Sequence, residues 1–505
     1  MGNEIMSASE SAFLLSGELR IQLTIILPLV ATLAIRFADK RPNVREAISL
    51  TTSAALVLLT YSLYRDFTRG FELALTWVEV LPGMALSFTT EPLGLLFALM
   101  ASFLWLVTSC YSIGYMRQQH QQGQTRFYQF FAVAIATVMG IAFAANLFTL
   151  FVFYELLTLS TYPLVTHGGD DKAKKGGRTY LALLLSTSII FFMIAIMATW
   201  LLAGTLDFTP GGIFNHQVST GICGVLLIFY IFGIGKAAIF PFHRWLPAAM
   251  VAPTPVSALL HAVAVVKGGV FTVLKVCSYI FGPELMTKLA STQALLYLAA
   301  ASVFLASLVA MRQDNLKKRL AYSTVSQLGY VTTAALLANN AGILAGTMHM
   351  VIHAFGKITL FFCAGAILVR TGKKHISQMV GLGHEMPFTM AAFFIASLSI
   401  IGLPPTAGLW SKWFLLQGVL DAGEWLLLLV LGLSSLMSIV YLLAIPVRAF
   451  FPGDGAGPVM PVRQEAPLPI LIAIGVSVSA CLLLFIFPQP LFELAAAVIT
   501  TGKGG

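Results

Sequence analysis

Charged residues are scarce in this chain, and long hydrophobic runs take their place. Only 10% of the 505 residues are charged, whereas 58% are hydrophobic. Soluble domains carry roughly 25% charged residues, so the composition excludes a soluble fold and indicates a polytopic membrane protein. The formal net charge of +9 does not indicate nucleic-acid binding. The basic residues lie in short loops between apolar runs, where positive charge reports membrane topology.

Cysteine is also rare, and its placement excludes several kinds of site. The five cysteines are Cys110, Cys223, Cys277, Cys363 and Cys481. They form no CxxC pair, so we expect packed free thiols instead of disulfides, metal ligands or a cluster. No dinucleotide or haem fingerprint is present, and GIGKAA lacks the spacing of a phosphate loop and its Ser or Thr. We therefore expect no cofactor and no redox chemistry in this chain itself.

Apolar segments long enough to cross a bilayer, about 20 residues each, predict fourteen transmembrane helices with no soluble domain between them. Residues 1–20 lack the regions of a signal peptide, so we expect the first span to be retained. The predicted ranges are 21–36, 46–64, 93–115, 128–145, 147–165, 179–204, 221–250, 255–280, 293–311, 324–340, 343–369, 388–417, 425–450 and 467–488.

The basic residues predict the orientation of these spans. Most Lys and Arg residues fall in loops that follow odd-numbered helices, and such loops are cytoplasmic by the positive-inside rule. Both termini are therefore expected on the non-cytoplasmic side.

Two of the predicted spans, helices 7 and 12, are interrupted by prolines. The stretch 233–267 holds two lysines, two histidines, one arginine and four prolines, and residues 401–416 read IGLPPTAGLWSKWFLL. Charge at membrane depth is costly, and freed backbone groups there must be buried in protein or face a wet cavity. We therefore expect both interruptions to line a hydrated path.

The interrupted helices are five apart, an odd interval that favours an inverted repeat of helices 4 to 8 and 9 to 13. Two coincidental proline kinks are the alternative. The predicted organisation has an N-terminal part with helices 1 to 3, two five-helix repeats, and a C-terminal helix 14. These parts cover residues 1–120, 121–285, 286–452 and 453–505.

The charges inside the spans are the candidate functional groups. Our count assigns one acid, Glu155, to the spans. It assigns five bases, namely Lys236, Arg244, Lys267, Lys357 and Lys412. So many cations at low dielectric cannot all stay charged, so some lysines should be neutral part of the time and able to relay protons. We expect Glu155 to interact with Lys236, and a static ion pair between helices 5 and 7 is the alternative.

Helix 11 carries His349, His353 and Lys357 at steps of four, which places all three on one face. A proton relay could run along this face. Packing histidines are an alternative. A zinc pair is disfavoured, because no HExxH motif is present and an ammonium one turn away would repel a cation. His261 and Lys267 are six residues apart and cannot share a helix face.

Two other polar stretches are interpreted more simply. His243 and Arg244 in PFHRWLP are expected near a membrane face, with Arg244 as an anchor. Residues 314–319, DNLKKR, are expected to form a solvated cytoplasmic loop.

Four motifs support a family resemblance: KAAIFPFHRWLPAAMVAPTPVSALLHAVAVVKGGV, NLKKRLAYSTVSQLGY, HMVIHAFGKITLFFCAG and GLPPTAGLWSKW. They resemble the antiporter-like subunits shared by respiratory complex I, membrane-bound hydrogenases and Mrp-type sodium/proton antiporters. The resemblance implies fourteen helices with two inverted repeats and a buried proton path. The residues of this chain on which that path falls are Glu155, Lys236, His261, Lys267, His349, His353, Lys357 and Lys412.

Within this family, the chain looks most similar to the D subunit of Mrp antiporters. Lys412 stands where the complex I subunit M typically has glutamate, and the chain stops soon after helix 14, without the long lateral helix of the largest such subunit. A complex I or hydrogenase subunit that depends on NADH, hydrogen or quinone is the main alternative, and an independent symporter is a third. The resemblance implies other membrane subunits as partners, transport of protons and possibly Na⁺, and a prokaryotic inner membrane.

Overall fold

The computed structural model describes residues 16–214, 218–451 and 463–500. The described chain is 79% helical, and eleven of its helices are long and apolar enough to cross a membrane. The predicted all-α polytopic membrane fold is therefore confirmed. The count of fourteen crossings, the inverted repeats and the four-part division stay predictions. Most of the signal-peptide prediction, and residues 453–462 and 501–505 of the C-terminal part, lie outside the described residues.

Helices of the first half lie within a few residues of the predicted spans, except that α7 begins at Asp171 instead of residue 179, and α6 coincides with its predicted range. A π-helical turn, Ser188–Met193, joins α7 to α8. The helices are α2 (Gly17–Phe37), α3 (Pro42–Thr68), α4 (Pro92–Gln118), α5 (Gln124–Ala142), α6 (Leu147–Val165), α7 (Asp171–Thr187), α8 (Ile194–Ala203), α9 (Thr220–Gly233), α10 (Trp245–Ala248), α11 (Thr254–Ala258) and α12 (Val265–Lys275).

The second half also follows the predicted spans, except that α15 begins at Leu316 instead of residue 324, and it adds helices that were not predicted: the short α13 and α17 and, last in the chain, α23. The 12 residues of α23 are too few to cross a bilayer, so a search for spans passes over it. The helices are α13 (Pro283–Met286), α14 (Ala290–Arg312), α15 (Leu316–Leu336), α16 (Asn340–Thr371), α17 (Leu382–Glu385), α18 (Pro387–Ile401), α19 (Gly408–Asp421), α20 (Trp425–Ser438), α21 (Ala444–Phe450), α22 (Leu468–Ile486) and α23 (Gln489–Thr500).

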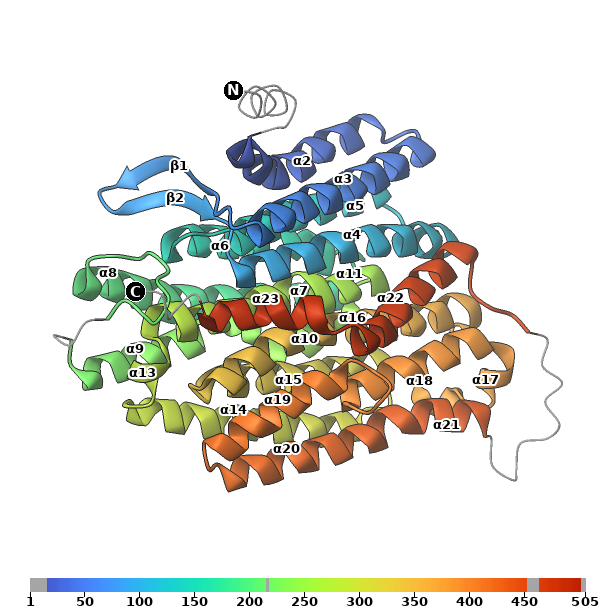
Figure 1. Ribbon diagram of the computed structural model, residues 1–505. Coiled ribbons are helices and arrows are strands. Elements are labelled where there is room, and N and C mark those ends of the chain that lie inside the picture. Colours follow the sequence, from blue (N-terminus) through green and yellow to red (C-terminus); the bar gives the residue numbers. More distant parts are fainter. Residues whose placement is uncertain (1–15, 215–217, 452–462, 501–505) are drawn as a thin grey trace, which may run out of the picture.

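A β-hairpin between α3 and α4 is the main departure from the all-helical prediction. Strands β1 (Ala74–Leu81) and β2 (Met84–Thr89) pair antiparallel. The turn contains Gly83 with φ +79°, a conformation that favours glycine. The hairpin projects from one end of the helix bundle (Figure 1).

Both predicted helix interruptions are present. In the first, α9 ends at Gly233, and two short 3₁₀ turns, Gly235–Ala237 and Phe242–Arg244, lead into α10. In the second, α18 ends at Ile401 and α19 begins at Gly408. Proline has no N–H to donate and cannot continue a helix across its own position. Pro241 lies in the first interruption, and Pro404 and Pro405 lie in the second.

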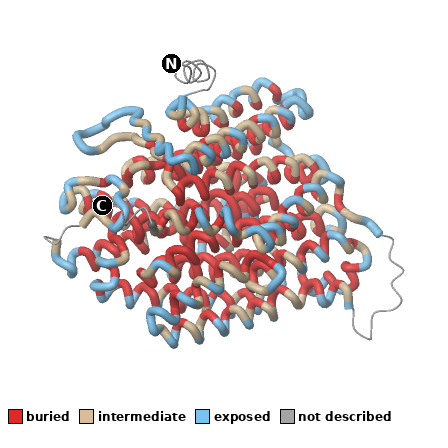
Figure 2. The backbone as a smooth tube through the Cα atoms, in the orientation of Figure 1, coloured by how far each residue is buried: buried red, intermediate tan, exposed pale blue. Residues whose placement is uncertain are grey.

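Burial separates the central helices from those at the edges. The membrane-length window of Asn340–Thr371 is 94% buried and that of Thr254–Phe281 is entirely buried, whereas that of α2 is 33% buried. Figure 1 shows α16 in the middle of the bundle, with α2 and α20 at opposite edges. Figure 2 shows buried residues concentrated between these edges. The residues that the sequence analysis singled out on helices 8 and 11 are therefore central.

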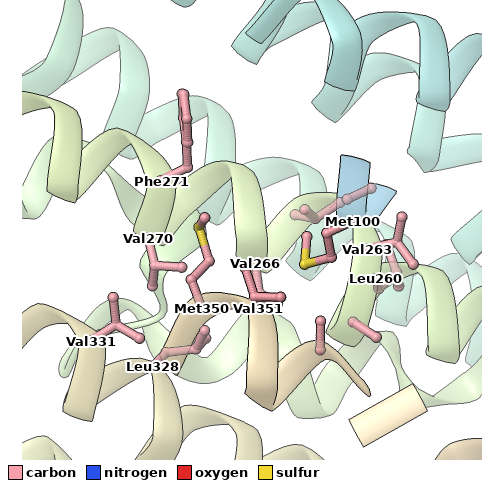
Figure 3. Close-up of a cluster of buried hydrophobic side chains, with 14 of the residues drawn as sticks. Met100, Leu260, Val263, Val266, Val270, Phe271, Leu328, Val331, Met350 and Val351 are labelled. Carbon is pink, nitrogen blue, oxygen red and sulfur yellow. The ribbon is translucent and has the colours of Figure 1, made fainter. Parts of the chain in front are cut away.

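The central helices meet in tight apolar packing. Val266 and Val270 of α12 lie close to Met350 and Val351 of α16, and Leu328 of α15 approaches the same region (Figure 3). Polar groups on these helices are thus surrounded by hydrocarbon side chains. In such surroundings an unpaired polar group is costly, so the partners of each one are informative.

Candidate functional site

Lys236 lies in the first helix interruption and is fully buried. Its Nζ donates to the carbonyl of Tyr154 at 2.8 Å and to Thr158 Oγ1 at 2.6 Å, both on α6. Nζ also lies 3.1 Å from the centre of the Tyr154 ring. Side chains form hydrogen bonds with backbone groups that the interrupted helix leaves unpaired. Lys236 N donates to Tyr154 Oη, and Trp245 Nε1 donates to Gly235 O.

Glu155 follows Tyr154 in α6 and is half-buried. It forms no ion pair with Lys236 among the contacts of the described residues. Its Oε1 is buried and has no hydrogen-bond partner there. The alternative of a static ion pair between helices 5 and 7 is therefore not supported. Lys236 contacts the carbonyl one residue before the acid, so the two groups are close enough for electrostatic interaction.

A chain of polar side chains crosses the centre of the bundle, and we call it the central polar chain: Lys267, His353, His349, Tyr330, Ser435 and Lys412. Lys267 Nζ lies 2.6 Å from His353 Nδ1, within hydrogen-bond distance. The His353 and His349 rings stack with centroids 5.8 Å apart, and the Tyr330 ring also stacks with His349, at 5.9 Å. The predicted face of helix 11 thus brings its two histidines together.

The far end of the central polar chain lies at the second interruption. Tyr330 Oη is 3.1 Å from Ser435 Oγ, and Lys412 Nζ donates to Ser435 Oγ at 3.0 Å and to Ile401 O at 2.8 Å. Gly402 has φ +91°, and a Cβ at that position would lie 2.6 Å from Lys412 Cδ. The glycine therefore lets the backbone turn and leaves room for the lysine stem.

His349 has two hydrogen-bond partners outside the central polar chain. Its Nδ1 lies 2.9 Å from Ser411 Oγ, next to Lys412 in the sequence, and its Nε2 lies 3.0 Å from Gln327 Oε1. Both ring nitrogens are thus hydrogen-bonded. The sequence analysis did not name Gln327, Tyr330, Ser411 or Ser435, because uncharged polar residues are common in membrane helices and carry no distinctive spacing.

Lys357 lies on the predicted face of helix 11 but points to a different set of partners. Its Nζ donates to Ser323 Oγ at 2.6 Å and to Leu320 O at 3.3 Å. Tyr441 Oη continues this branch, 3.2 Å from Ser323 Oγ and 2.9 Å from Ser438 Oγ. The structure thus places Lys357 on a side branch instead of in line with His353.

His261 joins neither set of hydrogen bonds. Both of its ring nitrogens are buried without a partner among the described residues, and the ring packs against Phe361 with centroids 4.6 Å apart. It lies in a π-helical turn, Leu259–Val263, that precedes α12. Lys267 reaches His353 and His261 does not, in line with the expectation that the two cannot share a face.

The link between the first interruption and the central polar chain is made by backbone packing. A Cβ added to Gly269 of α12 would collide with the backbone of Lys236 and Ala237. Helix α12 therefore lies directly on the interruption, and Lys267 is two residues away from this contact. No hydrogen bond joins Lys236 to Lys267 among those that the described residues form.

Two buried charge pairs were missed, Lys275–Glu91 and Arg45–Glu46. The count of charges within the spans is wrong because it omits Lys275 and Glu46. Lys275, at the end of α12, has a fully buried side chain and forms an ion pair with Glu91, the residue before α4. Its Nζ lies 3.9 Å from the centre of the Phe208 ring and 4.7 Å from that of Tyr279. The position of Lys275 inside the predicted span 255–280 was the available signal.

The remaining predictions concern groups nearer the surface. Arg244 is exposed, and His243 is half-buried and stacks on Phe240, which fits the simpler interpretation of this motif. The expectation of a solvated loop at 314–319 is wrong in part, because α15 begins at Leu316 and Lys317 Nζ reaches Ala252 O at 2.5 Å. Hydrogen bonds from Ser377 lower the pKa of the exposed Asp314 carboxyl.

The cysteines and the other potential metal ligands form no site of their own within the described ranges. Four cysteines are buried and Cys110 is half-buried, all with free thiols as expected. Within the described ranges, no three His, Cys, Asp or Glu side chains are grouped so that they could hold a metal ion. The arrangement is instead one of amines, imidazoles and hydroxyls, joined by hydrogen bonds except where the rings of His353, His349 and Tyr330 stack. Amines and imidazoles in such surroundings can take up and release protons.

The sequence matches a known family over its centre. The model described as "NADH:quinone oxidoreductase/Mrp antiporter, TM" matches residues 144–438. This chain is 30% identical over 455 residues to NADH-quinone oxidoreductase subunit N of Desulforudis audaxviator (strain MP104C), covering 88% of this chain and 89% of the relative. It is also 30% identical to a component of a probable K(+)/H(+) antiporter of Rhizobium meliloti (strain 1021), covering 78% of this chain and 39% of the relative.

The fold has a close counterpart among solved structures. A chain of the Mrp complex from Dietzia sp. DQ12-45-1b superposes with a TM-score of 0.85 at 20% identity, covering 97% of this chain and 98% of the other. At that identity the likeness concerns the fold alone. The family match spans more than half of the sequence and includes Glu155, Lys236, His353 and Lys412. This chain therefore belongs to the NADH:quinone oxidoreductase/Mrp antiporter family of transmembrane subunits.

Proposed function

We propose that this chain conducts protons across the membrane as one subunit of a larger assembly. The observation that carries the proposal is the central polar chain, which runs from Lys267 through His353 and His349 to Lys412 at the second interruption. Lys236 stands at the first interruption, beside α12. Charged side chains are retained in membrane helices mainly where they serve ion or proton pathways. Water molecules would bridge the gaps between these groups.

The finer assignment that we propose is the proton-conducting, D-like subunit of an Mrp-type Na⁺/H⁺ antiporter. The chain would lie in a prokaryotic inner membrane with both termini on the non-cytoplasmic side. The similarity to a component of a probable K(+)/H(+) antiporter of Rhizobium meliloti supports the antiporter part of this assignment. Other membrane subunits would then supply the exchanged cation's path, and we expect this chain to be inactive alone.

A second candidate function is a proton-pumping subunit of a complex I-like oxidoreductase or a membrane-bound hydrogenase. The match to subunit N supports it, because that match covers 89% of the relative's length. Relatives named chain 5 are longer than this chain, which spans 49% of the one from Synechocystis sp. (strain ATCC 27184 / PCC 6803 / Kazusa). The two candidates differ in energy source, since the second requires NADH, hydrogen or quinone.

The test is proton transport by the complete assembly in vesicles. Glu155→Ala, Lys236→Ala and Lys412→Ala should each abolish proton-coupled transport while leaving insertion and assembly intact, whereas Lys174→Ala, an exposed lysine on α7, should transport normally. Normal coupled transport in all three variants would remove the proposed path. Proton movement driven by a Na⁺ gradient alone favours the antiporter, and strict dependence on a redox substrate favours the second candidate.

A further inference from the structure

A basic hollow lies at one end of the bundle, and none of the proposed proton-path residues lines it. It has a volume of about 610 Å³ and is lined by the C-terminal end of α2, the start of α3 and the start of α5. A neighbouring hollow of about 560 Å³ shares Pro42, Gln121 and Gln124 with it. Figure 1 shows the connection between α2 and α3 at the end of the bundle opposite the β-hairpin.

The lining of this hollow is positively charged. Three guanidinium groups, those of Arg36, Arg45 and Arg126, line it against one carboxylate, Asp39. Asp39 offsets only Arg36, at 3.6 Å. Arg126 donates to the carbonyl of His167 and so has no carboxylate partner in this contact. The lining of the hollow thus carries a net positive charge, which favours binding of an anion.

Arg45 is the buried, hydrogen-bonded arginine of this hollow. It is 5% exposed, and it donates to Thr125 Oγ1 at 3.0 Å and to Gln124 Oε1 at 2.7 Å. The nearest carboxylate, Glu46, is 3.9 Å away and is held by Arg117. The Nε of Arg45 is buried with no partner among the described residues. A buried guanidinium with a free donor requires a further acceptor.

An apolar stripe on α2 leads away from the rim of the hollow. Ile26, Val30, Leu33 and Phe37 are 39%, 53%, 64% and 90% exposed, and their spacing of four, three and four places them on one helix face. From Ile26 to Phe37 the helix rises about 16 Å. That length is close to half of the roughly 30 Å hydrocarbon core of a bilayer.

We propose that the hollow binds the phosphate head group of an anionic phospholipid whose acyl chains lie along the apolar stripe of α2. Guanidinium groups bind phosphate through paired hydrogen bonds, and basic pockets between membrane helices suit anionic head groups. The hollow lies among loops rich in Lys and Arg, so the lipid would belong to the predicted cytoplasmic leaflet. The inference requires only membrane insertion and is independent of proton conduction.

The test measures lipid retention by the intact assembly in nanodiscs of equimolar phosphatidylglycerol and phosphatidylcholine, using native mass spectrometry. The wild-type protein should retain phosphatidylglycerol about tenfold more tightly, the factor expected for a charge-assisted hydrogen bond. Arg36→Gln/Arg126→Gln, which changes two exposed arginines, and Arg45→Gln should each lose this preference. Arg178→Gln changes an exposed arginine of α7 outside the hollow and should keep it.

Four results would overturn the proposal. The wild-type protein could show no preference between the two lipids, or the variants of the hollow could keep the preference. Inorganic phosphate could also displace the bound lipid as effectively as phosphatidylglycerol does, which would identify a free-phosphate site. Crosslinking of Leu33→Cys to a neighbouring subunit, with no lipid bound, would assign the stripe to a protein contact instead.

Discussion

At the scale of single residues, three buried or half-buried lysines share one kind of environment. Lys236, Lys357 and Lys412 each donate to one backbone carbonyl and one side-chain hydroxyl. A carbonyl accepts from an ammonium and from a neutral amine alike, and a hydroxyl can reverse its role and donate to the neutral amine. These lysines can therefore gain or lose a proton without losing their hydrogen-bond partners. A carboxylate partner would not allow this, because it favours the charged lysine and cannot donate to the neutral amine.

For this reason we expect the Ser435 hydroxyl beside Lys412 to be needed for proton transport. Ser435→Ala removes the hydroxyl that contacts both Lys412 Nζ and Tyr330 Oη, and it leaves Lys412 Nζ 4.7 Å from the centre of the Tyr330 ring. Hydrogen bonds to charged groups contribute roughly 1.5–3 kcal/mol, so we expect proton transport to slow about tenfold. The measurement is the initial rate of proton uptake by vesicles. Ser62→Ala is the control, since the Ser62 hydroxyl lies on α3 and donates to the carbonyl of Leu59, and equal rates in the two variants would contradict the role.

The pair of Lys275 and Glu91 makes a separate prediction about stability. Removing one partner of a buried pair leaves an uncompensated charge and costs about 3–5 kcal/mol, whereas replacing both is far less costly. Glu91→Gln and Lys275→Met should each lower the melting temperature of the purified assembly, and the double variant should recover most of the loss. A double variant no more stable than either single one would show that the two side chains act independently.

The sequence identified the charged residues well and their partners poorly. Lys267, His349 and His353 were predicted, because ionisable residues stand out in apolar helices. Tyr330 and Ser435, which join His349 to Lys412, were not, because a hydroxyl in a membrane helix is inexpensive and common. The direction of Lys357 toward Ser323 could not be predicted either, since residues on one face of a helix can contact different neighbouring helices.

At the scale of helices, α12 packs directly against the backbone of Lys236 in the first interruption. Gly269→Ala would drive a methyl group into the backbone of Lys236 and Ala237. Overpacking of this kind costs roughly 1–3 kcal/mol, and we expect it to displace Lys236 and reduce transport strongly. Proton uptake and thermal stability, measured together, check this prediction.

The adjacent glycine supplies a matched control. A Cβ at Gly268 would meet Leu157 Cδ2 at 3.4 Å and Ile141 Cδ1 at 3.6 Å, which are ordinary contacts. Gly268→Ala should therefore leave transport and stability near wild-type values. If both alanine variants behave alike, the position of α12 against the interruption does not determine transport.

The sequence also predicted helices better than the features between them. Hydrophobic length located α6, because the requirement for about 20 apolar residues acts on each segment alone, and prolines located both interruptions. The β-hairpin at residues 74–89 packs on Phe153 of α6, and the short helix α23 packs against α16. That packing involves residues distant in the sequence, so no local pattern revealed it.

At the scale of the whole molecule, the distribution of basic loops predicts which end of the bundle faces the cytoplasm. Lys174 near the start of α7 and Gln122 between α4 and α5 follow odd-numbered predicted helices and are exposed, whereas the exposed Pro82 lies in the hairpin after helix 2. In a variant without the five native cysteines, Pro82→Cys should react with a membrane-impermeant thiol reagent in intact cells. Lys174→Cys and Gln122→Cys should react only in inside-out vesicles. Because the basic hollow and these two positions share the predicted cytoplasmic side, a reversed labelling pattern would move the lipid site to the other leaflet and overturn the predicted location of both termini.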